Sequence, residues 1–143
     1  MDYQPFLGTW RLDTSACAYE VGEPPLEGIY RIEEDGEGLL FVAEWVTRAG
    51  EAKQVQYRSM PDGRPHPFEN PAVLDELITK VSPGPSLDTS SLKGGKVVAF
   101  ATRVLSADGQ AMTVTQSGTT SAGQAFSNVS LYRRVISDQA TVQ

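Results

Sequence analysis

The side chains best suited to chemistry are polar or phenolic groups that alternate with apolar residues along β-rich segments. Glu44, Tyr57 and Tyr132 are the candidate catalytic groups. A carboxylate or phenol in an apolar enclosure can exchange a proton with a bound molecule or polarise its carbonyl group. In one assignment of strand faces, Gln116 and Asn128 point inward near Tyr132, where each amide needs a hydrogen-bond partner such as a ligand.

The opposite assignment of faces turns Glu44 and Arg58 inward together from neighbouring strands. An inward carboxylate in an apolar barrel would have a raised pKa and could act as a general acid or base. We expect instead an exposed cross-strand ion pair, which contributes little to stability.

The sequence offers few residues for other kinds of catalysis. His66 and Cys17 are the only histidine and cysteine, and transition-metal sites usually combine several such ligands, so we expect no metal and no cofactor. A haem site through His66 is conceivable, but this residue lies between two prolines, where solvent exposure is the better prediction. No Gly-x-Ser-x-Gly motif supports a serine hydrolase. Cys17 cannot form an internal disulfide, and we expect it to be a small side chain rather than a reactive thiol.

Charge and hydropathy exclude two classes of partner. The formal net charge of −6 and the lack of a basic cluster argue against nucleic-acid binding. No apolar run is long enough to cross a bilayer, so no membrane partner is expected. The N-terminal residues 1–5 lack the basic and apolar regions of a signal peptide, which predicts a cytoplasmic protein.

Regularly spaced glycine turns are the clearest structural signal. They are Asp35-Gly36, Ala49-Gly50, Asp62-Gly63, Gly94-Gly95, Asp108-Gly109 and Ala122-Gly123. Asp-Gly and Gly-Gly favour tight hairpins because glycine accepts a positive φ. The runs between them are rich in residues that suit strands. We predict strands at 8–13, 27–34, 39–47, 52–60, 73–82, 86–93, 96–106, 111–119 and 125–135.

Two parts of this assignment are less regular. Residues 72–80 could place Leu74, Leu77 and Ile78 on one face of a helix, but the β-rich flanks favour a strand. Residues 14–26 and 61–71 are proline-containing connections, and the second could rim a barrel mouth.

Spacing and hairpin order together predict a fold. A step of about 14 residues allows a strand of about nine or ten residues, which suits a tilted barrel strand. A meander of this many twisted strands hides its edges only by closing. The prediction is an all-β, closed, antiparallel up-and-down barrel of about 8–10 strands over residues 1–136, with 137–143 as a flexible C-terminal tail.

Several short sequence segments, taken in their order along the chain, resemble those of a known protein family. Gly8-Thr9-Trp10, preceded by Phe6, resembles the Gly-x-Trp opening of lipocalins and other calycins, and residues 6–13 (FLGTWRLD) look like small bacterial lipocalin-like proteins. The pieces that agree further along are Asp62-Gly63, Asn70-Pro71, Gly94-Gly95-Lys96-Val97-Val98, Met112-Thr113-Val114-Thr115-Gln116 and Asn128-Val129-Ser130-Leu131-Tyr132. The resemblance implies a structural barrel floor in which Trp10 packs beneath Arg133 or Arg134. The Arg-x-Tyr close of fatty-acid-binding proteins is absent, so their carboxylate site is not carried over.

Strand alternation gives candidate ligand contacts inside the barrel. On the 39–47 strand either Phe41, Ala43 and Trp45 or else Leu40, Val42 and Val46 face inward; on the 96–106 strand the apolar set is Val98, Phe100 and Val104. The predicted contacts are Tyr30, Phe41, Trp45, Tyr57, Phe100, Met112, Val114, Gln116, Phe126, Asn128 and Tyr132.

Three functions remain open from the sequence. The first is binding of a small hydrophobic or amphipathic molecule inside the barrel. The second is a cofactor-free cyclase or isomerase acting on a substrate held there. The third is a structural barrel whose core is filled by its own side chains. In each case we expect a monomer or homodimer.

Overall fold

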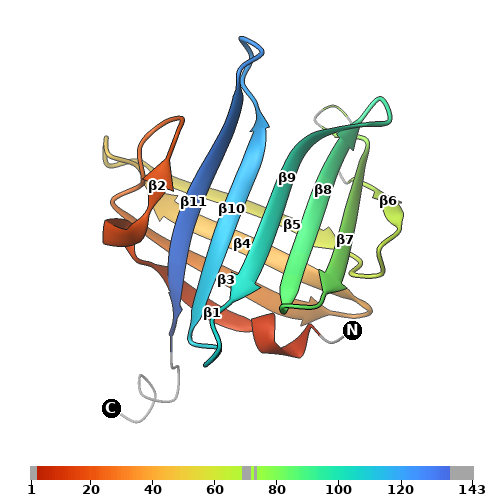
Figure 1. Ribbon diagram of the computed structural model, residues 1–143, viewed down its shortest axis with the longest axis horizontal. Helices are drawn as coiled ribbons and strands as arrows, with labels where there is room; N and C mark the ends of the chain where they lie inside the picture. Colours follow the sequence, from red (N-terminus) through yellow and green to blue (C-terminus); the bar gives the residue numbers. More distant parts are fainter. Residues whose placement is uncertain (1–2, 69–71, 73, 136–143) are drawn as a thin grey trace.

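The computed structural model describes residues 3–68, 72 and 74–135. These described residues form eleven strands and two short 3-10 helices, in an antiparallel sheet curled upon itself (Figure 1). Their bounds are η1 Gln4–Phe6, β1 Gly8–Leu12, η2 Thr14–Ala16, β2 Ala18–Tyr19, β3 Glu27–Asp35, β4 Gly38–Val46, β5 Ala52–Ser59, β6 Pro65–Pro67, β7 Glu76–Ser82, β8 Ser86–Lys93, β9 Lys96–Leu105, β10 Ala111–Thr119 and β11 Ala125–Arg134.

The strand order explains how the barrel closes. The sheet runs β5-β4-β3-β1-β11-β10-β9-β8-β7-β6, so the first strand pairs with the last long strand. In Figure 1, β7–β11 form a layer in front of β3–β5. Within the described residues no ladder joins β5 to β6 or β7, which leaves one seam there. The predicted all-β, up-and-down barrel is confirmed, with closure nearly complete.

The nine predicted strands are all present among the described residues. The turn residues between paired strands set where those strands end. Gly94 and Gly95 both have positive φ, 60° and 76°, between β8 and β9. A side chain would strain the backbone there, so glycine fixes this turn. Residues 76–82 form strand β7 rather than a helix. The sequence reading missed the short strands β2 and β6, which lie in the two connections expected to be irregular.

A solid core fills one end of the barrel. Phe6, Trp10, Ile32, Leu87 and Met112 are each completely shielded from solvent. They belong to a cluster with Tyr30, Leu39, Phe41, Leu105 and Val114. This end of the barrel, at Trp10 and Met112, is called the floor below. The predicted tail 137–143 lies outside the described residues.

Candidate ligand-binding cavity

A cavity of about 370 Å³ lies inside the barrel above the floor. The solvent exposure of the lining residues shows which end of the cavity is deep and which end is open. Tyr30, Arg103 and Val114 are buried at one end, whereas the side chains of Glu23 and Arg48 are 76% and 54% exposed at the other, the mouth. The lining residues are Leu12, Tyr19, Glu23, Pro25, Tyr30, Phe41, Ala43, Glu44, Trp45, Thr47, Arg48, Val55, Tyr57, Ala101, Arg103, Val114, Gln116, Ser130 and Tyr132.

Aromatic rings from three sides line the deep part of the cavity. Phe41 of β4 and Tyr57 of β5 are direct cross-strand partners, and their rings stack with centroids 5.0 Å apart. Tyr30 of β3 lies 6.4 Å from Phe41 and 5.5 Å from Tyr132 of β11. Such rings offer a large apolar surface at little conformational cost, and the phenols add polar ends.

Arg103 of β9 is the one charged side chain that the described residues bury completely, with 1% exposure. Its Nε donates to the phenol oxygen of Tyr30 and its Nη2 to that of Tyr57, both at 2.9 Å. Its Nη1 donates to the Leu87 carbonyl at 3.2 Å and to Thr89 Oγ1 at 3.1 Å. These bonds occupy four of the five guanidinium N–H groups. None of these acceptors is a carboxylate, so the positive charge has no ionic partner among the described residues.

The guanidinium also lies against an aromatic ring. Its Cζ is 4.4 Å from the centroid of Phe41 and 5.8 Å from that of Tyr30. Cation–π attraction is strongest between buried groups, and Arg103 and Phe41 are each only 1% exposed. Arg103 is therefore held by dipoles and π-faces, which leave its net charge uncancelled.

Buried hydroxyl groups connect Arg103 to the seam. Thr89 Oγ1 lies 3.1 Å from Thr79 Oγ1, which lies 2.6 Å from Ser59 Oγ across the β5/β7 seam. All three residues are buried. Each hydroxyl can donate to one neighbour and accept from another, so this chain solvates part of the guanidinium without water.

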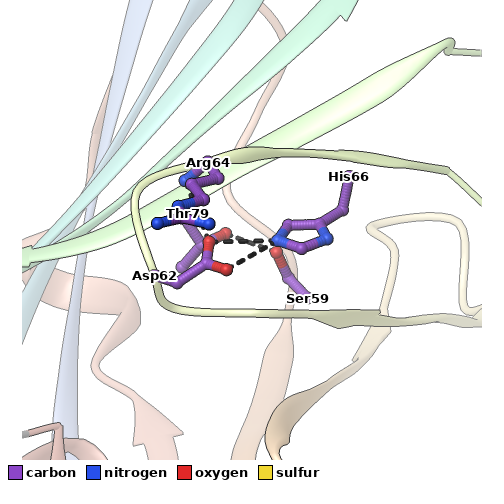
Figure 2. A network of polar contacts seen from close by, with 5 residues as sticks. All are labelled: Ser59, Asp62, Arg64, His66 and Thr79. Atoms are coloured by element: carbon purple, nitrogen blue, oxygen red, sulfur yellow. Dashed lines mark hydrogen bonds and ion pairs between the residues drawn. The ribbon is translucent and has the colours of Figure 1, made fainter.

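Beside the seam, His66 turns back toward Asp62 (Figure 2). The Nε2 atom lies 2.9 Å and 3.0 Å from the two carboxylate oxygens. A hydrogen bond from the Arg64 backbone N–H, together with His66, holds the pKa of Asp62 below its usual value. His66 remains about one-third exposed and is not among the residues that line the cavity. It closes a surface loop.

Burial sets the ionisation of the cavity groups. Desolvation raises the pKa of Tyr30 and of Tyr132 well above the ordinary phenol value. Desolvation acts to lower the pKa of Arg103, but Tyr30 and Tyr57 outweigh it and the net shift is upward. At neutral pH Tyr30 and Tyr132 are therefore neutral phenols, and Arg103 in the same cavity is a permanent cation.

Seven of the predicted contact residues line the cavity: Tyr30, Phe41, Trp45, Tyr57, Val114, Gln116 and Tyr132. The first of the two assignments for the 39–47 strand, with Phe41, Ala43 and Trp45 inward, is the one that lines it. Met112 is inside the barrel but belongs to the floor core rather than to the cavity wall.

Three of the predicted contacts, Phe100, Phe126 and Asn128, lie outside the cavity lining. Phe100 is 36% exposed, and the residues of β9 that reach the cavity are Ala101 and Arg103. The whole predicted set Val98, Phe100 and Val104 thus faces outward, because the apolar face of β9 is the outer one. Phe126 packs beside Gly118 and does not line the cavity.

Asn128 is also absent from the cavity lining. Its Oδ1 accepts the backbone N–H groups of Glu20 and Val21, at 2.9 Å and 3.1 Å. The buried amide expected to need a ligand is satisfied by the chain itself.

Glu44 has a different partner from the one predicted. Its carboxylate lies 2.8 Å from Arg31 and is 43% exposed, while Arg58 pairs with Asp35 instead. The register sets Glu44 opposite Gln54, and Arg58 opposite Leu40. Glu44 does reach the mouth of the cavity, but it is not the desolvated carboxylate that a buried general base requires.

At the floor, Arg134 rather than Arg133 covers Trp10. The Arg134 Cζ lies 4.2 Å from the Trp10 ring centroid, and its three nitrogens donate to the carbonyls of Pro5, Leu7 and Gly109. Arg133 points elsewhere and pairs with Asp13 at 3.0 Å. Neither Trp10 nor Arg134 lines the cavity, so their contact belongs to the floor.

In the part of the chain that the structure describes, no group of three His, Cys, Asp or Glu side chains could hold a metal ion. No helix there is long and apolar enough to span a membrane.

Comparison with known proteins identifies the architecture. No family model matches the sequence, and no curated protein matches it significantly. In structure the chain is similar to zebrafish ileal bile acid-binding protein, whose crystal structure holds cholic acid. The TM-score is 0.51 at 13% sequence identity, over 92% of this chain and 99% of that one. The two proteins therefore share an antiparallel β-barrel fold. The closer resemblance to bacterial lipocalin-like proteins stays a prediction.

Proposed function

We propose that this protein binds a small amphipathic molecule that carries an anionic group, with the anion at Arg103 and the apolar body among the aromatic rings above it. The observation that carries the proposal is a buried guanidinium in a cavity wall without a carboxylate partner. A buried ion without a counter-charge is costly, and an anionic ligand would supply one.

The cavity suits the apolar part of such a ligand. Its volume of about 370 Å³ lies in the range of pockets for small organic molecules. Phe41 and Trp45 are four residues apart on β4, and both line it. Four strand residues span about 13 Å. A ligand with a body of about this length would reach from Arg103 to the mouth.

The structural neighbour supports the same ligand class. Its name states that it binds bile acids, and the cholic acid in its crystal structure is an amphipathic carboxylic acid. The alternative of a filled, purely structural core is at odds with the cavity. A catalytic role for Tyr57 or Tyr132 stays a prediction from the sequence.

The test compares two ligands that differ only in the head group. Sodium dodecanoate and 1-dodecanol are titrated into the protein while the fluorescence of Trp45 is followed. We expect the acid to bind at least about tenfold more tightly, since a hydrogen bond to a charged group contributes about 1.5–3 kcal/mol. In Arg103→Met the preference for the acid should disappear while the alcohol still binds.

Tyr57→Phe is a milder companion variant, because it removes one phenol next to Arg103 and keeps the ring that stacks on Phe41. We expect a loss of about three- to tenfold in affinity for dodecanoate. If neither ligand binds the wild-type protein, the proposed function is wrong. Equal affinities for acid and alcohol would refute the role of Arg103 alone.

A further inference from the structure

The connection from β2 to β3, residues 20–26, borders the mouth of the cavity and is called the strap below. Two of its residues, Glu23 and Pro25, line the cavity together with Thr47 and Arg48 of the β4–β5 turn. The strap thus forms a wall of the cavity on the side where exposure is highest. In Figure 1 it is the orange loop above β2.

One end of the strap is held firmly to β11. Asn128 accepts the N–H groups of Glu20 and Val21 through Oδ1 and donates through Nδ2 to the Val21 carbonyl at 2.9 Å. Glu20 in turn accepts the Ser127 backbone N–H at 2.7 Å. Four hydrogen bonds at two adjacent residues make this a fixed attachment.

Among the described residues, the middle of the strap is held by one exposed side chain, that of Arg48. Arg48 Nε donates to the Pro24 carbonyl at 3.0 Å and lies 4.0 Å from the Glu23 carboxylate. Such exposed contacts are weak and exchange readily with water. Gly22, between the fixed end and this contact, has a φ of 76°, a conformation that side-chain-bearing residues rarely adopt. The Pro24-Pro25 pair that follows is stiff.

From this arrangement we infer that the strap is the movable wall of the cavity: it turns at Gly22, is anchored by Asn128, and opens when Arg48 releases Pro24. Ligand passes between the strap and the β4–β5 turn. Arg48 is then a positioning residue whose contact controls access, and Asn128 positions the wall. The passage of ligand rests on the proposed function, whereas the motion of the strap does not.

The first experiment needs no ligand. The Leu26 N–H donates to the Val46 carbonyl at 2.8 Å, so its hydrogen exchange reports opening of the far end of the strap. In Arg48→Ala we expect Leu26 to exchange about three- to tenfold faster, the effect of losing one exposed charge-assisted hydrogen bond. Glu20 and Val21 should stay within about twofold, because their acceptor is intact. Unchanged exchange at Leu26 would overturn the inference.

Two variants make this reading specific. Arg58→Ala removes another exposed arginine, at the opposite end of β5, and should leave strap exchange unaltered. Asn128→Ala should reverse the pattern, with Glu20 and Val21 accelerated most. Faster hydrogen exchange across the whole sheet in Arg48→Ala would indicate global destabilisation. It would also contradict the inference that the Arg48–Pro24 contact acts locally on the strap.

The second experiment measures stopped-flow binding of dodecanoate. In Arg48→Ala both the association and dissociation rates should rise by about three- to tenfold, so that the dissociation constant changes less than either rate. Unchanged rates in Arg48→Ala with faster rates in Ser59→Ala would place access at the β5/β7 seam and refute the route. If the wild-type protein binds no ligand, the proposed function fails, and the exchange experiment alone decides whether the strap opens at Arg48.

Discussion

Two arginines face aromatic rings, one at the floor and one at the deep end of the cavity, and their partners differ in kind. Arg134 covers Trp10 and donates to three backbone carbonyls at the floor. Arg103 lies over Phe41 but donates mainly to side-chain hydroxyls and phenols at the cavity wall. Backbone acceptors are fixed by the fold, whereas phenols can turn toward a ligand. Arg134 is therefore an arginine of the floor, whereas Arg103 faces the space inside the cavity.

The two regions should therefore respond differently to mutation. Floor residues pack against one another with no space for solvent, so their loss leaves a void. Cavity residues already border a space, so truncation there enlarges a hollow that the native structure tolerates. Stability should reside in the floor, and binding in the cavity.

The largest expected effect is that of Trp10→Ala. Trp10 is fully buried, and its indole N–H donates to the Phe6 carbonyl at 3.1 Å. We expect a loss of about 3–5 kcal/mol in the free energy of unfolding, as for other buried tryptophans. Urea denaturation followed by far-UV circular dichroism measures it. A loss below about 1 kcal/mol would show that the floor is not the stabilising region.

Arg134→Met should have the next largest effect. It removes three hydrogen bonds from a cation and its contact with Trp10, while the exposed edge of the site lets water replace part of them. We expect a loss of about 2–3 kcal/mol in the same denaturation experiment. Arg133→Met is the matched control, because Arg133 makes an exposed ion pair and should cost less than about 1 kcal/mol. Similar losses in both variants would show that the floor contacts of Arg134 stabilise the protein no more than the exposed ion pair of Arg133.

Alkaline pH should destabilise the protein through the cavity phenols. Burial raises the pKa of Tyr30 and Tyr132 in the folded state, so above about pH 10 the unfolded chain loses phenolic protons that the native state keeps. The free energy of unfolding should be independent of these groups below pH 10 and fall above it, by up to about 1.4 kcal/mol per pH unit for each phenol.

Urea denaturation between pH 8 and pH 11 measures this slope, and Tyr132→Phe should make it shallower. The same shallow slope in the wild-type protein and in Tyr132→Phe would mean that the phenol is solvated in the native state.

The fold was predictable from sequence because its information is local. Glycine turns such as Gly94-Gly95 set hairpin ends, and strand composition fills the intervals. The strap attachment was not predictable, because Asn128 meets Glu20 and Val21 more than a hundred residues away. The short β2 strand depends on the same distant pairing with β11.

Arg103 was the main omission at the site, and hydrophobicity pointed the wrong way. The valines and phenylalanine of β9 suggested an inward face, yet they cover the outside of the barrel. The correct signal was register: with Val114 inward, the β9–β10 hairpin pairs it with Arg103 and places both on one face. A buried charge is an exception to the rule that the more apolar face of a strand points inward. Such exceptions are expected at functional sites.

The smallest expected effect on stability is that of Arg103→Met, even though Arg103 is almost completely buried. Replacing a buried, uncompensated cation with an apolar side chain of similar length removes a desolvation cost and is often neutral or stabilising. The phenols of Tyr30 and Tyr57 line the cavity, so water can replace the guanidinium as their donor. We expect the free energy of unfolding to stay within about 1 kcal/mol of the wild-type value or to increase. A loss above about 2 kcal/mol would make Arg103 a structural residue like Arg134, and its charge would then no longer argue for an anionic ligand.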